Sequence, residues 1–202
     1  MTTRTNADGA GYLFARVVAE VLSPAVVVLV LSFVVAWRGT GHDVPGTVAW
    51  ALVVAVFYSV VPMAVAVRGA RRGYWGGHWV RERERRITPL LVCLGSTLLG
   101  LAILLVGQAP SEMVALAGAM IATLAACLAI TRWWKVSIHA AVAGGATALV
   151  TLLYGPVMLV TGLVVVLVGW SRVRVAAHTV TQVAVGALVG PVIGGAVFLL
   201  LR

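Results

Sequence analysis

Two of the four histidines lie close to basic residues, where long apolar runs begin. His139 follows Lys135 by four residues, and His178 follows Arg172 by six. Residues four apart share one face of a helix, so Lys135 is expected beside His139. Gln182 has the same spacing from His178. A histidine can attack phosphorus or protonate a leaving oxygen, and lysine and arginine bind phosphate oxygens. The pattern predicts a site for a phosphate group.

Both histidines are expected near the N-terminal ends of apolar helices, over residues 136–154 and 177–201. A helix N-terminus presents unpaired N–H groups and the positive end of the helix dipole, which together bind anions. The alternative is that these are polar helix ends whose side chains reach toward lipid headgroups. Two histidines with cations on one side of a membrane favour a site over that alternative.

The acidic residues are too few and too scattered to predict a metal site. They are Asp8, Glu20, Asp43, Glu82, Glu84 and Glu112. Mg²⁺ takes several oxygen ligands, and no two of these carboxylates have the spacing of a shared site on a helix. The sequence has no HExxH zinc motif. Cys93 and Cys127 lie within apolar runs and lack the spacing of metal ligands or of a disulfide framework. We therefore expect no metal and no cofactor.

The residues around His178 resemble a motif of the type 2 phosphatidic acid phosphatase family, membrane relatives of the vanadium haloperoxidases. That family carries three motifs, KxxxxxxRP, PSGH and SRxxxxxHxxxD. The sequence SRVRVAAHTVTQ, residues 171–182, matches the third motif at Ser171, Arg172 and His178. It differs at Gln182, where the family has aspartate.

The second motif is similar to VSIH, residues 136–139. Ser137 and His139 match the family pattern. Val136 replaces its proline and Ile138 replaces its glycine. The bulky Ile138 is expected to narrow the phosphate pocket.

The first motif is expected in RERERRITP, residues 81–89. Aligned on its final proline, this segment has Arg81 at the family's lysine position and Thr88 at its arginine position. A small shift puts Arg85 or Arg86 at the arginine position instead. The order and spacing of the three segments fit the family.

The resemblance, which spans about residues 81–190, implies a role for each matched residue. His178 would be the nucleophile that takes the phosphoryl group, and His139 would protonate the leaving oxygen. Gln182 would orient His178, but an amide accepts the imidazole N–H without the charge of a carboxylate. The phosphate oxygens would be held by Lys135, Ser137, Arg172 and one or more of Arg81, Arg85 and Arg86.

Composition places these segments in a membrane protein. Of the 202 residues, 61% are hydrophobic and 10% are charged, and the mean hydropathy is +1.05. A soluble domain has about 25% charged residues, and about 20 apolar residues cross a bilayer. The expected fold is one all-α domain over residues 1–202, a polytopic bundle of six to seven transmembrane helices. The apolar runs are 13–37, 46–67, 88–107, 110–131, 136–154, 156–170 and 177–201.

The basic residues are divided unevenly between the two sides of such a bundle. With seven spans, the side opposite the N-terminus holds Arg38 and Arg202. The positive-inside rule makes the other side cytoplasmic, so the N-terminus and the site are expected at the cytoplasmic face of the cell membrane. The basic residues behind the net charge of +9 are then expected to contact lipid phosphates rather than nucleic acid. The N-terminal side holds thirteen cations: Arg4, Arg16, Arg68, Arg71, Arg72, Arg81, Arg83, Arg85, Arg86, Arg132, Lys135, Arg172 and Arg174.

Small residues in two of the expected helices are spaced for close packing. The last helix carries Gly186, Gly190 and Gly194 at intervals of four. The helix over 136–154 carries Ala140, Ala141, Gly144 and Gly145.

The leading hypothesis is a metal-independent hydrolase, a lipid phosphate or isoprenoid diphosphate phosphatase that acts through a phosphohistidine. The amide at Gln182 leaves two alternatives open. One is a lyase or cyclase that ionises a prenyl diphosphate at its C–O bond. The other is a non-catalytic relative that binds lipid. In each case the expected partners are membrane lipids and a phosphorylated lipid.

Overall fold

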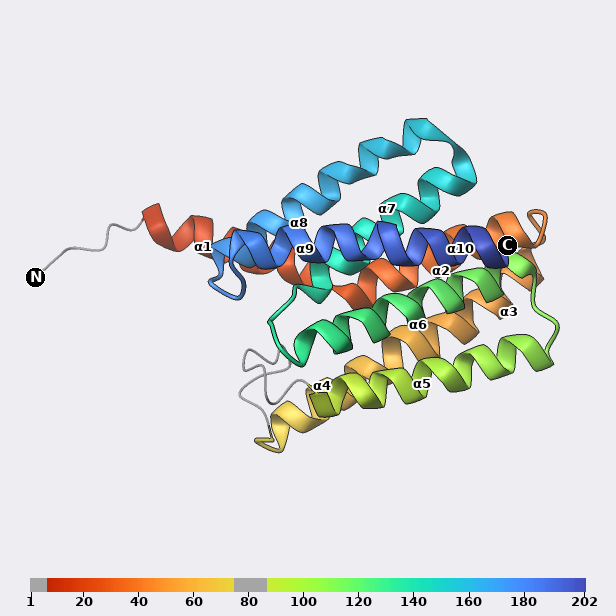
Figure 1. The fold of residues 1–202 in the computed structure, drawn as a ribbon, viewed down its shortest axis with the longest axis horizontal. Coiled ribbons are helices and arrows are strands. Elements are labelled where there is room, and N and C mark those ends of the chain that lie inside the picture. The colour runs from red at the N-terminus through yellow and green to blue at the C-terminus, as the bar shows by residue number, and fades with distance from the viewer. Residues whose placement is uncertain (1–6, 75–86) are drawn as a thin grey trace, which may run out of the picture.

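A computed structural model describes residues 7–74 and 87–202 of the chain. Every regular element in these two ranges is a helix, and the longer helices run roughly along one direction (Figure 1). This confirms the all-α class. Five helices are long and apolar enough to cross a membrane, or six if the bent pair at the N-terminus is one span. The helix Ile138–Tyr154 is apolar but shorter, with 17 residues.

The first expected span is broken rather than continuous. Helix α1 (Ala7–Val21) and helix α2 (Pro24–Gly39) meet at an angle of 41°. Proline has no N–H and disfavours helical backbone in the residue before it. Ser23 accordingly takes an extended conformation with φ −65° and ψ 154°. The break at Pro24 therefore follows from the covalent structure of proline.

The second expected span is one rod, Val44–Arg71, with a π-helical segment in its middle. Pro62 cannot donate a hydrogen bond to the preceding turn. The carbonyl of Phe57 instead accepts from the hydroxyl of Ser96 at 2.6 Å. The rod consists of α3 (Val44–Ala55), η1 (Val56–Val60) and α4 (Val61–Arg71).

The remaining helices form two hairpins and a final rod. Helices α5 (Ile87–Val106) and α6 (Ser111–Thr131) are joined by a tight turn at 107–110, between the two predicted apolar runs. Helix α7 (Ile138–Tyr154) turns at Gly155, where φ is +96°. The next span is longer than expected, since η3 (Pro156–Thr161) continues into α8 (Gly162–Arg174). The last rod consists of α9 (Val180–Val189), η4 (Gly190–Gly194) and α10 (Gly195–Leu201).

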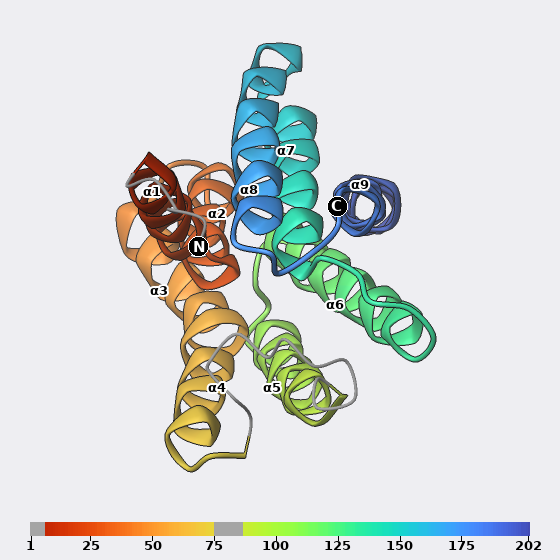
Figure 2. The same ribbon diagram turned by 90° about the vertical axis from the view of Figure 1, so that its left-hand side faces the viewer.

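Helix α7 lies against α2, α6, α8 and the last rod (Figure 2). A Cβ atom on Gly186 would overlap the Ser137 carbonyl, and one on Gly190 would overlap the Ala141 carbonyl. A Cβ on Gly144 would lie 2.5 Å from the Ala187 carbonyl. The predicted close packing of the small residues is confirmed, and it fixes the start of α7 against α9.

The two ends of the helix bundle differ in charge. At the end that holds α1 (Figure 1), the C-terminus of α4 carries Arg68 and Arg71, and the C-terminus of α8 carries Arg172 and Arg174. At the other end lies Arg38, in the last turn of α2. The described residues thus place the basic ends of α4 and α8, and both candidate histidines, at one end of the bundle.

Candidate functional site

Two segments more than thirty residues apart in sequence meet at the basic end of the bundle. The Lys135 ammonium donates a hydrogen bond to the Ala177 carbonyl at 2.7 Å. The Ser137 N–H donates to the Gln182 carbonyl at 3.2 Å. These two bonds join the segment before α7 to the turn between α8 and α9 and to the first turn of α9, as one shared site requires.

Lys135 does not share a helix face with His139. It lies in the non-helical segment before α7, which begins at Ile138. Its side chain crosses to the α8–α9 turn instead of running along its own helix. The prediction from four-residue spacing is therefore wrong here, because Ser137 caps the helix and ends the helical periodicity before Lys135 is reached.

Ser137 is the N-cap of α7, and its backbone is extended with φ −87° and ψ 103°. Its hydroxyl oxygen accepts from the Ala140 N–H at 3.4 Å, as an N-cap side chain does. His139 follows in the first helical turn and is 6% exposed. The expected helix N-terminus beside a histidine is present at this position.

Arg172 lies in the last turn of α8 and is 4% exposed. Its carbonyl accepts from the N–H groups of Ala177 at 3.0 Å and His178 at 3.2 Å. Ala176 donates to Val173 at 2.9 Å and has a positive φ of 52°. This is the Schellman pattern of helix termination, and it fixes His178 directly beyond the end of α8.

His178 precedes α9 rather than lying on it, so it does not share a helix face with Gln182. Thr179 is the N-cap of α9. Its hydroxyl accepts from the Gln182 N–H at 3.3 Å, while the Gln182 side-chain oxygen accepts from the Thr179 N–H at 3.2 Å. This reciprocal pair is a capping box. Thr179 was not among the predicted site residues, although Thr-x-x-Gln before an apolar run is the sequence signal of that box.

The capping box also determines the hydrogen bonding of His178. Because Gln182 Oε1 accepts from the Thr179 N–H, the orientation of the amide is set. The same oxygen lies 3.2 Å from His178 Nδ1. A carbonyl oxygen only accepts, so Nδ1 carries the hydrogen in this pair, and in the neutral form of the ring the lone pair then lies on Nε2. His178 is 7% exposed, which shields this lone pair from bulk water.

The arginines assigned to the first motif, Arg81, Arg85 and Arg86, lie outside the described residues. Helix α5 begins directly after them at Ile87. Helices α5 and α7 start at the same end of the bundle (Figure 1).

Ile138 lines an apolar cavity between the helices. The cavity has a volume of about 220 Å³ and its walls come from α2, α4 to α7 and neighbouring segments. The sequence analysis did not predict it, because its walls are ordinary apolar residues brought together by tertiary packing.

Comparison of the chain with protein-family models, with curated proteins and with solved structures finds no match. Among the described residues, no three or more His, Cys, Asp and Glu side chains gather as a set of metal ligands. The chemistry available at the site is that of buried imidazoles, cations and helix N-termini.

Proposed function

We propose that this chain is a membrane phosphatase that hydrolyses a lipid phosphate or an isoprenoid diphosphate through a phosphohistidine. The observation that carries the proposal is the contact between His178 Nδ1 and Gln182 Oε1. A ring hydrogen on Nδ1 supports this role, because a neutral ring then carries its lone pair on Nε2, the atom that would attack phosphorus. The burial of His178 and His139 supports a reaction protected from bulk water.

The first step forms a bond between His178 Nε2 and phosphorus and breaks the P–O bond to the leaving group. Protonated His139 gives its proton to the leaving oxygen. In the second step water attacks phosphorus, His139 takes a proton from that water, and the P–N bond breaks. Inorganic phosphate leaves and His178 returns to its neutral form. Lys135, Ser137 and Arg172 hold the phosphate oxygens, together with arginines from the first motif.

Gln182, the hydrogen-bond partner of His178, carries no charge. This leaves a second candidate reaction, the ionisation of a prenyl diphosphate. There the cations and helix N-termini would stabilise a leaving diphosphate, and no histidine would need to attack. In ¹⁸O-labelled water, the phosphatase puts label into the released phosphate, because it breaks the P–O bond. Unlabelled inorganic diphosphate together with a hydrocarbon product would select the lyase. Tight binding of the lipid without turnover would select the non-catalytic relative.

Substitution of the histidines tests the assignment directly. His178→Ala is expected to abolish phosphate release from a panel of lipid phosphates. His139→Ala is expected to slow release most for poor leaving groups. The matched control is His42→Ala, since His42 lies in the α2–α3 turn at the opposite end and packs on Trp37. Full activity in folded His178→Ala contradicts the proposal.

We also propose that the chain spans the membrane seven times, with the site at the cytoplasmic face. The charge difference between the two ends supports this orientation. Single cysteines at Ala70, near the end of α4, and at Ser111, at the start of α6, lie at opposite ends. In intact cells an impermeant thiol reagent is expected to label Ser111→Cys and spare Ala70→Cys. The reverse labelling would place the site outside.

A further inference from the structure

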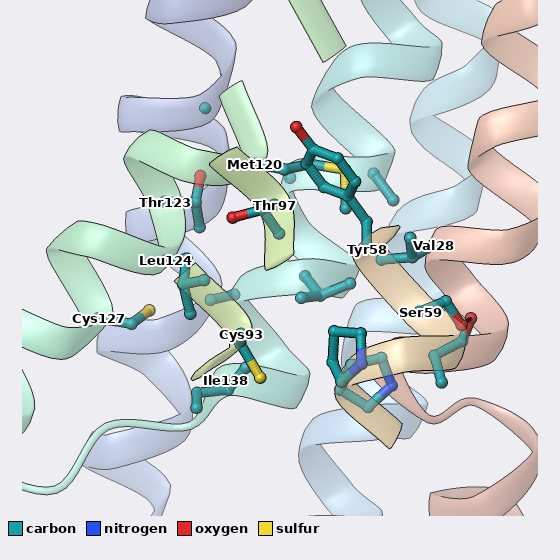
Figure 3. A pocket seen from close by; sticks show the side chains of 18 of the residues that line it. Val28, Tyr58, Ser59, Cys93, Thr97, Met120, Thr123, Leu124, Cys127 and Ile138 are labelled. Atoms are coloured by element: carbon teal, nitrogen blue, oxygen red, sulfur yellow. Dashed lines mark hydrogen bonds between the residues drawn. The ribbon is translucent and has the colours of Figure 1, made fainter. Parts of the chain in front are cut away.

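The apolar cavity runs along α7, from Ile138 at its start to Leu149 three turns later. At 1.5 Å per residue this is a length of about 16 Å. Figure 3 shows the wall residues around it, with Ile138 near one end. Ile138 stands between Ser137 and His139, so the cavity begins beside the candidate site. An apolar space of this length that starts beside the candidate site can hold part of a lipid chain.

The hydroxyl of Tyr58 differs from the other hydroxyls in the cavity wall. Ser59, Thr97 and Thr123 each donate their hydrogen to a backbone carbonyl. The acceptors are Ala25 at 2.8 Å, Leu94 at 2.9 Å and Ala119 at 2.8 Å. Tyr58 is 6% exposed, and its hydroxyl has no hydrogen-bond partner among the described residues. Leaving a buried donor unpaired is unfavourable, so a ligand with an acceptor at this depth would be stabilised.

Tyr58 lies deep within the bundle rather than at the headgroup level. It is in the π-helical segment η1, more than three turns from Arg71 at the basic end of the same rod. At 1.5 Å per residue this separation is about 20 Å. A phosphate or ester at the basic end cannot reach that far, so the acceptor must belong to the interior of the chain. The π-helical geometry at Tyr58 is a feature that often marks functional positions.

Water is a poor occupant of this cavity. A buried water takes two to four polar partners, and an apolar cavity of about 150 Å³ stays dry and binds benzene. The present cavity is larger, at about 220 Å³. Within a hydrocarbon chain, the group that accepts a weak hydrogen bond is the π-face of a carbon–carbon double bond.

We propose that the cavity binds one hydrocarbon chain of the lipid substrate and that the Tyr58 hydroxyl donates to a double bond in that chain. Tyr58 is then a specificity residue that favours unsaturated chains, such as prenyl or unsaturated acyl chains, over saturated ones. The inference deepens the proposed function, since it rests on the same site for the phosphate end of the lipid.

The test measures binding of phosphate-free lipid alcohols to the purified full chain. Radiolabelled geranylgeraniol is displaced by its fully hydrogenated counterpart and, separately, by oleyl and stearyl alcohols. The unsaturated alcohol of each pair is expected to bind roughly two- to fivefold more tightly, the ratio for a weak hydrogen bond. A preference in the prenyl pair alone assigns the double bond to a prenyl chain, and a preference in the oleyl pair alone assigns it to an acyl chain.

Tyr58→Phe is expected to lose this preference and to bind the saturated alcohol at least as tightly as the native chain does. Tyr154→Phe is the matched control, because the Tyr154 hydroxyl donates to the Val34 carbonyl at 2.8 Å and lies outside this cavity. Ala146→Leu, which fills the cavity, is expected to weaken all four alcohols, whereas Ala125→Leu on the exposed face of α6 is not.

Equal binding of saturated and unsaturated alcohols by the native chain would overturn the role of Tyr58. Unchanged binding in folded Ala146→Leu would overturn the cavity as the chain site. Phosphate release from a short-chain lipid phosphate, measured on the same proteins, reports the proposed function separately. A chain that binds alcohols but releases no phosphate keeps this inference and refutes the phosphatase.

Discussion

Replacement of Gln182 by glutamate tests whether the missing charge limits His178. Gln182 is the third residue of α9, a position where the capping box takes either Glu or Gln. Glutamate has the same length, so one oxygen can keep both contacts of 3.2 Å, to the Thr179 N–H and to His178 Nδ1. The substitution therefore adds a negative charge without moving the start of α9.

The expected gain follows from the kind of hydrogen bond that is formed. A neutral hydrogen bond contributes about 1 kcal/mol and one to a charged group about 1.5–3 kcal/mol. In the proposed mechanism the imidazole becomes positive as His178 attacks phosphorus, so a gain of about 1.4 kcal/mol in the transition state would raise kcat roughly tenfold. The Coulomb attraction at 3.2 Å is about 5 kcal/mol at an effective dielectric constant of 20. Solvent screening and partial desolvation of the carboxylate at this half-buried position offset most of it.

Steady-state phosphate release from a lipid phosphate measures this effect. Gln182→Asp is one methylene shorter and is expected to gain less, since it cannot reach both N–H groups. Gln182→Leu has a similar size and no acceptor, and it is expected to lose activity. If folded Gln182→Glu releases phosphate at the native rate or more slowly, then the charge on the partner of His178 does not limit the reaction.

Further predictions concern the helix contacts and the chemistry. Thr179→Ala is expected to cost about 1 kcal/mol of stability by removing the cap of α9 and to lower phosphate release, while Thr179→Ser keeps both. Gly190→Ala is expected to destabilise by about 1–3 kcal/mol, because the added Cβ meets the Ala141 carbonyl. Gly95→Ala, whose Cβ meets nothing within 4 Å, is expected to leave the melting temperature unchanged or raised. Phosphate release is expected to survive excess EDTA, since the sequence lacks a carboxylate cluster. Loss of release in EDTA and rescue by Mg²⁺ would contradict the histidine mechanism.

The sequence predicted the helices well where a single local signal decides the outcome. The apolar runs 88–107 and 110–131 end and begin at glycine and proline, and the turn lies there. The helix starts at Ser137 and Thr179 also carry capping residues, but both helices were predicted to begin two or three residues too early. The break at Pro24 had an equally clear local signal, but the long apolar run on both sides hid it. Hydropathy alone cannot distinguish one span from two helices that meet at an angle.

The side-chain contacts were less predictable, because they depend on where each helix begins. A spacing of four residues places two side chains together only if both lie in the helix. Lys135 and His178 each lie outside the helix that follows, and their contacts come from turn geometry. No sequence pattern distinguished Tyr58, whose hydroxyl differs from the other hydroxyls of the cavity wall in having no hydrogen-bond partner among the described residues. The lack of a partner for its hydroxyl among the described residues depends on tertiary packing, which no local pattern encodes.

An amide beside His178 has a consequence for the choice of substrate. In the proposed mechanism Gln182 fixes the ring as a carboxylate would but stabilises the positive imidazole less, so the rate of attack is expected to depend more on the leaving group. Charge gathers on the leaving oxygen in phosphoryl transfer. A lipid diphosphate releases a lipid monophosphate, which holds that charge better than the alkoxide released by a lipid monophosphate. The native chain is therefore expected to hydrolyse the diphosphate with a kcat/KM at least about tenfold higher, the factor that corresponds to 1.4 kcal/mol. In Gln182→Glu the ratio is expected to narrow, because the imidazole then has a charged partner. Equal kcat/KM values for the two lipids in the native chain would show that Gln182 serves His178 as well as a carboxylate does.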